Sequence, residues 1–196
     1  MKNKIVKIII VVIILLLILT GVYFLFIKDN KKEKNISDEY TLVSKDNVFE
    51  YKTSEEIIKI LEHGTGIVFL GFKECPWCQQ YAKILDDLSK EEGIDVIYYY
   101  DIRKDREENN ETYKKIVSIL EENLDYDKEG NRRIYVPDVS FILSGEVVYH
   151  TNETSMIEGE VTPEEYWTDD KLYETKKSLT KYYNDISNSM CTSCNE

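Results

Sequence analysis

A strand-like apolar segment that leads directly into a two-cysteine turn and a helix is the feature that most constrains this chain. Residues 66–72, "GIVFLGF", form a continuous apolar run of the length of a buried central strand. From Pro76 onward, apolar residues recur at three- and four-residue steps, which is typical of an amphipathic helix. The segment therefore predicts a strand, a short turn ending at Cys75, and a helix that carries Cys78 on its apolar face.

The remainder of the chain beyond residue 40 alternates helical and strand-like patterns. Helices are expected over residues 53–64, 106–124 and 167–186, and a capping box opens the first of them. Strands are expected over residues 94–102, 135–143 and 146–150. Ser144-Gly145 joins the last two strands as a hairpin. This order predicts an α/β fold in which helices flank a mixed central sheet.

Near the N-terminus, residues 8–27 contain no charged side chain and are long enough, as a helix, to cross a bilayer core of about 30 Å. No small-residue cleavage site follows, so an uncleaved anchor is favoured over a removed signal peptide. The expected organisation is a short tail (1–7), one transmembrane anchor (8–27), a charged linker (28–39), a folded domain (40–187) and a flexible tail (188–196). We expect a single-pass protein of the cell membrane with an extracytoplasmic domain.

The charge is distributed unevenly between the two ends of the chain. Residues 1–34 carry seven lysines and two acids, a net charge of +5, whereas the whole chain carries −12, which leaves −17 for residues 35–196. So acidic a domain excludes nucleic acid and anionic lipid as its partners. About 155 residues are enough to bury one core without disulfides, so the cysteines are not expected to be scaffolding.

The spacing of Cys75 and Cys78 suits thiol–disulfide exchange. A thiol is nucleophilic only as its thiolate, and the unpaired N–H groups at a helix N-terminus stabilise an anion. Pro76 at the first helical position costs nothing there, because its missing N–H would be unpaired anyway. Cys78, one turn on, faces the same side and can attack a mixed disulfide formed at Cys75. We expect Cys78 to be the more buried of the two.

The apolar strand, the C-P-W-C sequence that opens a helix and the later "IYVPDVSFILSGEVV" together resemble the thioredoxin superfamily. Membrane-anchored Gram-positive proteins of this superfamily, including bacteriocin-transport accessory proteins, are the most similar subgroup. The resemblance implies a thioredoxin-like fold with Cys75 as the attacking cysteine and Cys78 as the resolving one. It also implies a cis peptide bond at Val136-Pro137, which would bind an extended substrate segment.

The implied activity is that of a thiol–disulfide oxidoreductase acting on protein cysteines, with no cofactor and no metal. Trp77, between the cysteines, is expected to be exposed beside the thiols, where it would contact substrate or tune the pair; a purely packing role is the alternative. A membrane or secreted redox partner would be needed to regenerate the pair. The direction of electron transfer stays open at this point.

One departure from the family is clear. Thioredoxins have a buried acid six residues before the first cysteine, and here that position is Phe69. The acid is absent or supplied from elsewhere, with Glu74 a candidate. A non-catalytic thioredoxin-like adaptor or folding aid in an envelope or export complex is therefore the alternative function.

The second CxxC pair, Cys191 and Cys194, has two open interpretations. It is either a dithiol that relays electrons to and from the first pair or a surface disulfide without a catalytic role. A zinc or iron–sulfur site built from both pairs is disfavoured, because the pairs are more than a hundred residues apart. His63 and His150 stand alone in the sequence and are expected to be solvated.

Overall fold

The computed structural model describes residues 34–152 and 161–192, together with Ile13, Leu15, Leu16 and Thr20. The chain divides into two units, residues 1–34 and 35–196, each compact in itself. The expected transmembrane anchor at 8–27 lies almost wholly outside the described residues. Among the residues that are described, no helix is both long enough and apolar enough to cross a membrane.

A five-stranded mixed sheet forms the centre of the second unit, with strand order β1-β3-β2-β6-β7. The strands are β1 (Phe49–Tyr51), β2 (Gly66–Gly71), β3 (Ile97–Asp101), β6 (Asp138–Leu143) and β7 (Glu146–Thr151). The first three strands run parallel, whereas β6 and β7 are antiparallel to their neighbours. The prediction of an α/β fold with a mixed central sheet is therefore confirmed.

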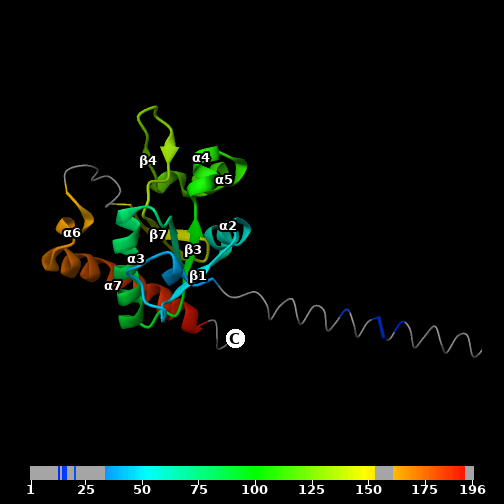
Figure 1. Ribbon diagram of the computed structural model, residues 1–196, viewed down its shortest axis with the longest axis horizontal. Coiled ribbons are helices and arrows are strands. Elements are labelled where there is room, and N and C mark those ends of the chain that lie inside the picture. The colour runs from blue at the N-terminus through cyan, green and yellow to red at the C-terminus, as the bar shows by residue number, and fades with distance from the viewer. Residues whose placement is uncertain (1–12, 14, 17–19, 21–33, 153–160, 193–196) are drawn as a thin grey trace, which may run out of the picture. The chain divides into compact units, whose positions relative to one another are not determined.

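Helices cover both faces of this sheet (Figure 1). They are α2 (Ser54–His63), α3 (Pro76–Glu91), α4 (Arg103–Glu108), α5 (Glu111–Leu120), α6 (Pro163–Tyr166) and α7 (Asp169–Thr192). Strand β2 is buried along its whole length, as its continuous apolar sequence predicts. On one face Phe141 packs edge-to-face on Tyr183 of α7, with ring centroids 5.2 Å apart. The core thus extends through the sheet into the helices on either side.

Two local predictions are confirmed by the backbone. Thr53 accepts a hydrogen bond from the Glu56 N–H while the Glu56 side chain accepts one from Thr53 N, which is a complete capping box. The β6–β7 hairpin turns at Ser144 and Gly145, whose φ angles are 53° and 82°. A hydroxyl-bearing residue tolerates that left-handed conformation less well than glycine does, and the Ser144 N–H is held by the Thr65 hydroxyl at 2.9 Å.

The domain begins earlier than predicted. Residues 28–39 were expected to be a linker, but Asn35 caps a 3-10 helix, η1 (Ile36–Asp38), and Ile36 is fully buried. Tyr40, which follows it, is also fully buried. The sequence prediction was wrong because two buried side chains within a polar stretch leave no periodic pattern.

Three other boundaries differ from the predictions. The expected helix 106–124 is broken at Asn109, whose left-handed φ of 46° ends α4, and Asn110 then caps α5. A 3-10 helix, η2 (Glu121–Asn123), follows, and then a small hairpin of β4 (Asp125–Tyr126) and β5 (Arg132–Arg133). The last helix continues to Thr192, so residues 188–192 of the expected flexible tail are helical.

Candidate active site

The junction between β2 and α3 holds the first cysteine pair. Strand β2 ends at Gly71, and the chain turns so that the Cys75 N–H donates to the Phe72 carbonyl at 3.1 Å. Cys75 is the N-cap of α3, and its Sγ accepts a hydrogen bond from the Cys78 N–H at 3.1 Å. Pro76 occupies the first helical turn. The sulfur therefore takes the position that an N-cap oxygen usually has, beside unpaired helical N–H groups.

The two thiols are free and differ in burial, as expected. Cys78 is fully buried, whereas Cys75 retains 8% exposure. The hydrogen bond from the Cys78 thiol lowers the pKa of Cys75 against the effect of burial, and the N–H groups of Cys78 and Trp77 lower it further. Burial, together with the neighbouring Cys75 sulfur, raises the pKa of Cys78. Cys75 is thus the more acidic thiol of the pair and Cys78 the less acidic one.

The loop before β6 comes to the same place. The peptide bond Val136-Pro137 is cis, as the resemblance implies. The Cys75 thiol lies 3.9 Å from the Val136 carbonyl oxygen, across a wide separation in sequence. Both Val136 and Pro137 are buried. Three of the residues singled out in the sequence, Cys75, Val136 and Pro137, therefore meet around one sulfur atom.

Trp77 is not exposed as predicted. It is half-buried, and its ring packs edge-to-face on Tyr166 of α6 with centroids 5.4 Å apart. The segment that carries α6 was expected to be a plain polar connection. Trp167 stacks on Tyr81 of α3 at 5.5 Å and anchors this segment further along the same helix. The side chain of Trp77 thus packs against α6, while its backbone N–H faces the Cys75 sulfur.

A tyrosine hydroxyl takes the place beside Cys78 where the resemblance implies an acid. A methyl group at Gly71 would lie 3.2 Å from the Tyr40 hydroxyl and 3.3 Å from Cys78 Sγ, so both border the same small space. Tyr40 donates a hydrogen bond to the Tyr99 hydroxyl at 3.2 Å. Burial raises the pKa of Tyr40 and of Tyr99 far above the ordinary value, so both phenols stay protonated.

Phe69 and Glu74 occupy quite different positions. Phe69 is fully buried against Tyr40 and Tyr99, with centroid distances of 6.2 and 5.6 Å. Glu74, the candidate replacement acid, is exposed and forms an ion pair with Arg103 at 3.0 Å. Sequence reasoning missed Tyr40 because it lies at the first position of the predicted domain, directly after the segment taken for a linker, and belongs to no motif. The fully apolar strand around Phe69 indicated that a polar partner would have to come from elsewhere.

A second buried ionisable pair begins directly after Pro137 in the sequence. Asp138, directly after Pro137, contacts His150 Nε2 through Oδ2 at 2.9 Å, and both side chains are almost fully buried. Burial raises the pKa of Asp138. Burial lowers the pKa of His150, but the hydrogen bond and charge of Asp138 outweigh it and leave that pKa raised. The expectation that His150 is solvated is therefore wrong, because β7 pairs with β6 and buries the His150 side chain against Asp138.

The second CxxC pair is only partly described. Cys191 lies in the last turn of α7, and Cys194 lies outside the described residues. The relay and surface-disulfide interpretations of this pair both remain predictions. Within residues 34–152 and 161–192, no three His, Cys, Asp or Glu side chains gather in a way that could hold a metal ion.

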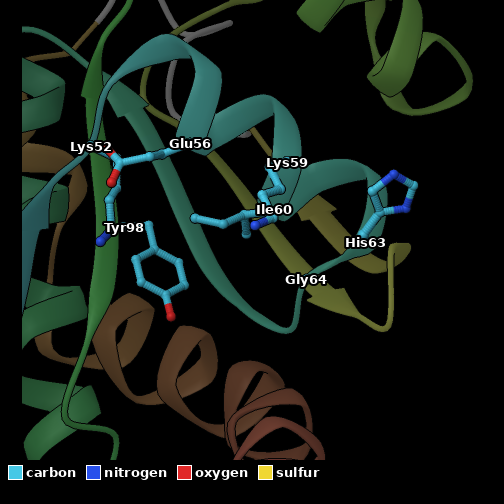
Figure 2. A pocket seen from close by; sticks show the side chains of 7 residues that line it. All are labelled: Lys52, Glu56, Lys59, Ile60, His63, Gly64 and Tyr98. Atoms are coloured by element: carbon cyan, nitrogen blue, oxygen red, sulfur yellow. The ribbon is translucent and has the colours of Figure 1, made fainter.

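A surface pocket lies apart from the cysteines (Figure 2). It is formed between α2 and β3, and Lys52, Glu56, Ile60, His63 and Tyr98 are among the residues that line it. In Figure 2, Tyr98 points into the space below α2, and His63 lies at the far end of the helix. None of the candidate site residues borders this pocket, so it belongs to a different part of the surface.

The comparisons with known proteins give no family assignment. The chain matches no protein-family model, no curated protein and no solved structure.

Proposed function

We propose that this protein is a membrane-tethered thiol–disulfide oxidoreductase with a thioredoxin-like fold, acting on protein cysteines outside the cytoplasm. The observation that carries the proposal is the position of Cys75: its sulfur caps α3, accepts the Cys78 N–H at 3.1 Å and faces the Val136 carbonyl. Parallel β1, β3 and β2 followed by antiparallel β6 and β7 support the fold assignment. The apolar segment 8–27 supports the membrane anchor.

The chemistry is an exchange of two electrons between two pairs of sulfurs. In the reductive direction, the Cys75 thiolate attacks one sulfur of a substrate disulfide, and the other substrate sulfur leaves as a thiolate. Cys78 then loses its proton and attacks the Cys75 sulfur of the mixed disulfide, which releases the second substrate thiolate. The substrate gains two electrons, and the Cys75–Cys78 pair becomes a disulfide. The oxidative direction is the same sequence reversed.

Substrate access has a structural basis beside Pro76. An open hollow adjoins the start of α3 and is bordered by Leu42, Lys73, Glu74 and Gln80. Leu42 exposes 41% of its surface there. An extended substrate segment that lies along this hollow would bring a cysteine to the partly exposed Cys75 sulfur. The Val136 backbone would then pair with that segment as an added strand.

The test uses the full-length chain in mild detergent, with Cys191 and Cys194 replaced by serine and glutathione disulfide as the probe. We expect the protein to form an internal Cys75–Cys78 disulfide and to release two molecules of reduced glutathione. In the Cys78→Ser variant, the reaction should stop at a Cys75–glutathione mixed disulfide that mass spectrometry can locate. If no adduct forms at Cys75, the oxidoreductase proposal fails.

The alternative is a non-catalytic adaptor or folding aid, and the replacement of the expected acid by Phe69 favours it. An adaptor would bind its partner through surfaces that do not require sulfur chemistry. Its binding would survive Cys75→Ser unchanged, and its Cys75 would react with glutathione disulfide no faster than an ordinary thiol.

A further inference from the structure

The arginines of this chain are confined to two short segments. The sequence contains four of them among 25 basic residues, and all four lie in α4 or in β5, the strand that precedes Val136. Lysine serves every other basic position. Because a guanidinium stacks on aromatic rings and is less strongly hydrated than an ammonium, arginine is better suited to a partly buried charge. The arginines of α4 and β5 are therefore the basic residues best suited to partly buried positions.

Arg106 lies between the two segments that surround the Cys75 sulfur. Its guanidinium stacks over the Phe72 ring at 5.0 Å, and Nη1 donates to the Ile134 carbonyl at 3.4 Å. The Phe72 carbonyl accepts the Cys75 N–H, and Ile134 lies two residues before Val136. Arg106 is half-buried in this position. One cation thus spans the loop before α3 and the loop before β6.

Arg106 lacks the carboxylate partner that its neighbour has. Arg103 stacks over the same Phe72 ring at 5.6 Å, but it forms ion pairs with Glu74 at 3.0 Å and with Glu107 at 2.9 Å. In the part of the chain that the structure describes, no ion pair includes Arg106. Burial lowers the pKa of Arg106 and the charge of Arg133 lowers it further, whereas Tyr113, Cys78 and Cys75 act in the opposite direction.

The Cys75 sulfur lies between the same two loops that Arg106 spans, since Cys75 follows Phe72 in one loop and its thiol lies 3.9 Å from the Val136 carbonyl oxygen of the other. The hydrogen bond from Cys78 and the N–H groups of Cys78 and Trp77 lower the pKa of Cys75 most, and the charge of Arg106 acts in the same direction on both thiols. Tyr40, which faces the thiols from the segment after η1, stays neutral because its pKa is raised. Of these groups, Cys75 is therefore the one whose pKa is lowered and that is suited to carry a negative charge opposite Arg106.

We propose that Arg106 is a positioning residue, the counter-ion of the Cys75 thiolate, and that it makes the pair a donor of disulfides. The inference rests on the proposed function and deepens it by assigning a direction. The reduced pair holds an anion beside Arg106, whereas the disulfide holds none, so Arg106 stabilises only the reduced form. Stabilising the reduced form of a dithiol makes its disulfide a stronger oxidant.

In this direction the Cys75–Cys78 disulfide oxidises a substrate dithiol in two exchanges. A thiolate of a reduced substrate attacks Cys75 Sγ of the Cys75–Cys78 disulfide, and Cys78 leaves and takes a proton. The second substrate thiolate attacks the substrate sulfur of the mixed disulfide, and Cys75 leaves as the thiolate beside Arg106. The substrate loses two electrons and two protons and gains a disulfide. The pair gains both electrons and one proton, and the other proton goes to solvent.

The test compares Arg106→Gln with Arg103→Gln in the full-length chain that lacks Cys191 and Cys194. Two quantities are measured: the pH dependence of Cys75 alkylation by iodoacetamide, and the equilibrium of the pair with reduced and oxidised glutathione. We expect Arg106→Gln to move the alkylation profile of Cys75 to higher pH, so that the rate on the rising limb falls about three- to tenfold, and to shift the glutathione equilibrium, measured at a pH above that limb, by a similar factor towards the disulfide. Arg106→Lys should recover most of both changes.

Arg103→Gln is the matched control. Arg103 stacks on the same Phe72 ring, but two carboxylates already neutralise its charge. The substitution should leave both quantities within about twofold of the parent. Arg106→Met removes the charge but keeps an unbranched apolar side chain against the Phe72 ring. It replaces Arg106→Gln in the test if the glutamine variant does not fold. The inference is overturned if neither Arg106→Gln nor Arg106→Met moves the alkylation profile, or if Arg103→Gln moves it equally.

The two proposals fail in different ways. If the alkylation profile is unchanged while exchange with glutathione proceeds, the role of Arg106 is wrong and the oxidoreductase function stands. If Arg106→Gln shifts the profile but no Cys75–Cys78 disulfide forms, Arg106 is the thiolate counter-ion and the oxidoreductase function, with its direction, is wrong.

Discussion

Two pairs of ionisable side chains lie on the two faces of β2, and they have opposite environments. Cys75 and Cys78 lie on the face of Phe69 and Gly71, whereas Asp138 pairs in register with Leu70 and lies with His150 on the other face. In each pair the two groups contact each other and shift each other's pKa. Only the cysteines lie at the start of a helix, where Cys75 is the N-cap of α3.

The difference lies in what stabilises the charged form. Backbone N–H groups surround the Cys75 sulfur and favour an anion, and Arg106 adds a positive charge. Asp138 has no such donors: burial raises its pKa, and its Oδ1 has no hydrogen-bond partner among the described residues. A pair of coupled ionisable groups is therefore suited to chemistry only where the fold supplies hydrogen-bond donors to the charged form and lets a substrate reach it. The Asp138–His150 pair is a structural feature of the β6–β7 hairpin.

The largest expected effect is the loss of sulfur chemistry on substitution of Cys75. Cys75→Ser should abolish formation of the internal disulfide with glutathione disulfide, because no thiolate remains at the α3 N-cap. Non-reducing mass spectrometry measures the product. The substitution His63→Gln, at an exposed position, serves as the control and should leave the reaction unchanged. Retained turnover in Cys75→Ser would mean that the tail pair carries the chemistry.

The next effect falls on stability and tests the other pair. Asp138→Ala should lower the free energy of unfolding by about 3 kcal/mol, because it removes one partner of a buried hydrogen-bonded pair. Urea denaturation measures this loss, and Asp138→Asn, which keeps an acceptor for His150, should lose less. The thiolate fraction of Cys75 in the folded variants should stay within about twofold of the parent. A large change there would show that the two pairs are coupled through Pro137.

A smaller effect is expected from the tyrosines beside Cys78. Tyr40→Phe removes the donor to Tyr99 and leaves a buried hydroxyl unpaired, which costs about 1 kcal/mol or somewhat more. Tyr99→Phe and the double variant complete a cycle that isolates the contact between the two hydroxyls. Additive losses in denaturant unfolding would indicate that the two hydroxyls do not interact.

The smallest effect is a dependence of stability on pH. The pKa of His150 in the folded protein is raised above its ordinary value of 6.5. A raised histidine pKa contributes stability that is fully present below pH 6.5 and is lost as the pH rises through the folded pKa. The free energy of unfolding should therefore fall from pH 6 to pH 9 in the parent and fall less in His150→Gln. Equal slopes in the two proteins would contradict the buried pair.

The sequence predicts the dithiol well because its signals are local. An apolar strand, a proline after Cys75 and a helical apolar face all lie within one short segment, and the hairpin after Pro137 has its own turn residues. Tyr40 and Arg106 were not predictable in the same way. Each reaches the cysteines from an element whose position depends on the packing of the whole sheet, and neither lies in a recognisable motif.

The errors in boundaries have the same physical origin. Ile36 and Tyr40 pack into the core from a polar segment, so tertiary contacts override the local composition. The break at Asn109 depends on one left-handed residue within a charged run that is otherwise helical. His150 is covered because β7 pairs with β6 and brings it to Asp138, a long-range contact that the isolated residue does not indicate.

The most direct test of the central claim is the alkylation of the reduced full-length chain as a function of pH, with the two thiols resolved by mass spectrometry. The claim is that Cys75 is a stabilised thiolate and Cys78 a buried thiol. It predicts that Cys75 reacts with iodoacetamide with an apparent pKa below the ordinary cysteine value of about 8.5, while Cys78 stays unmodified. Equal reactivity of the two thiols, or an apparent pKa for Cys75 at or above that value, would contradict it.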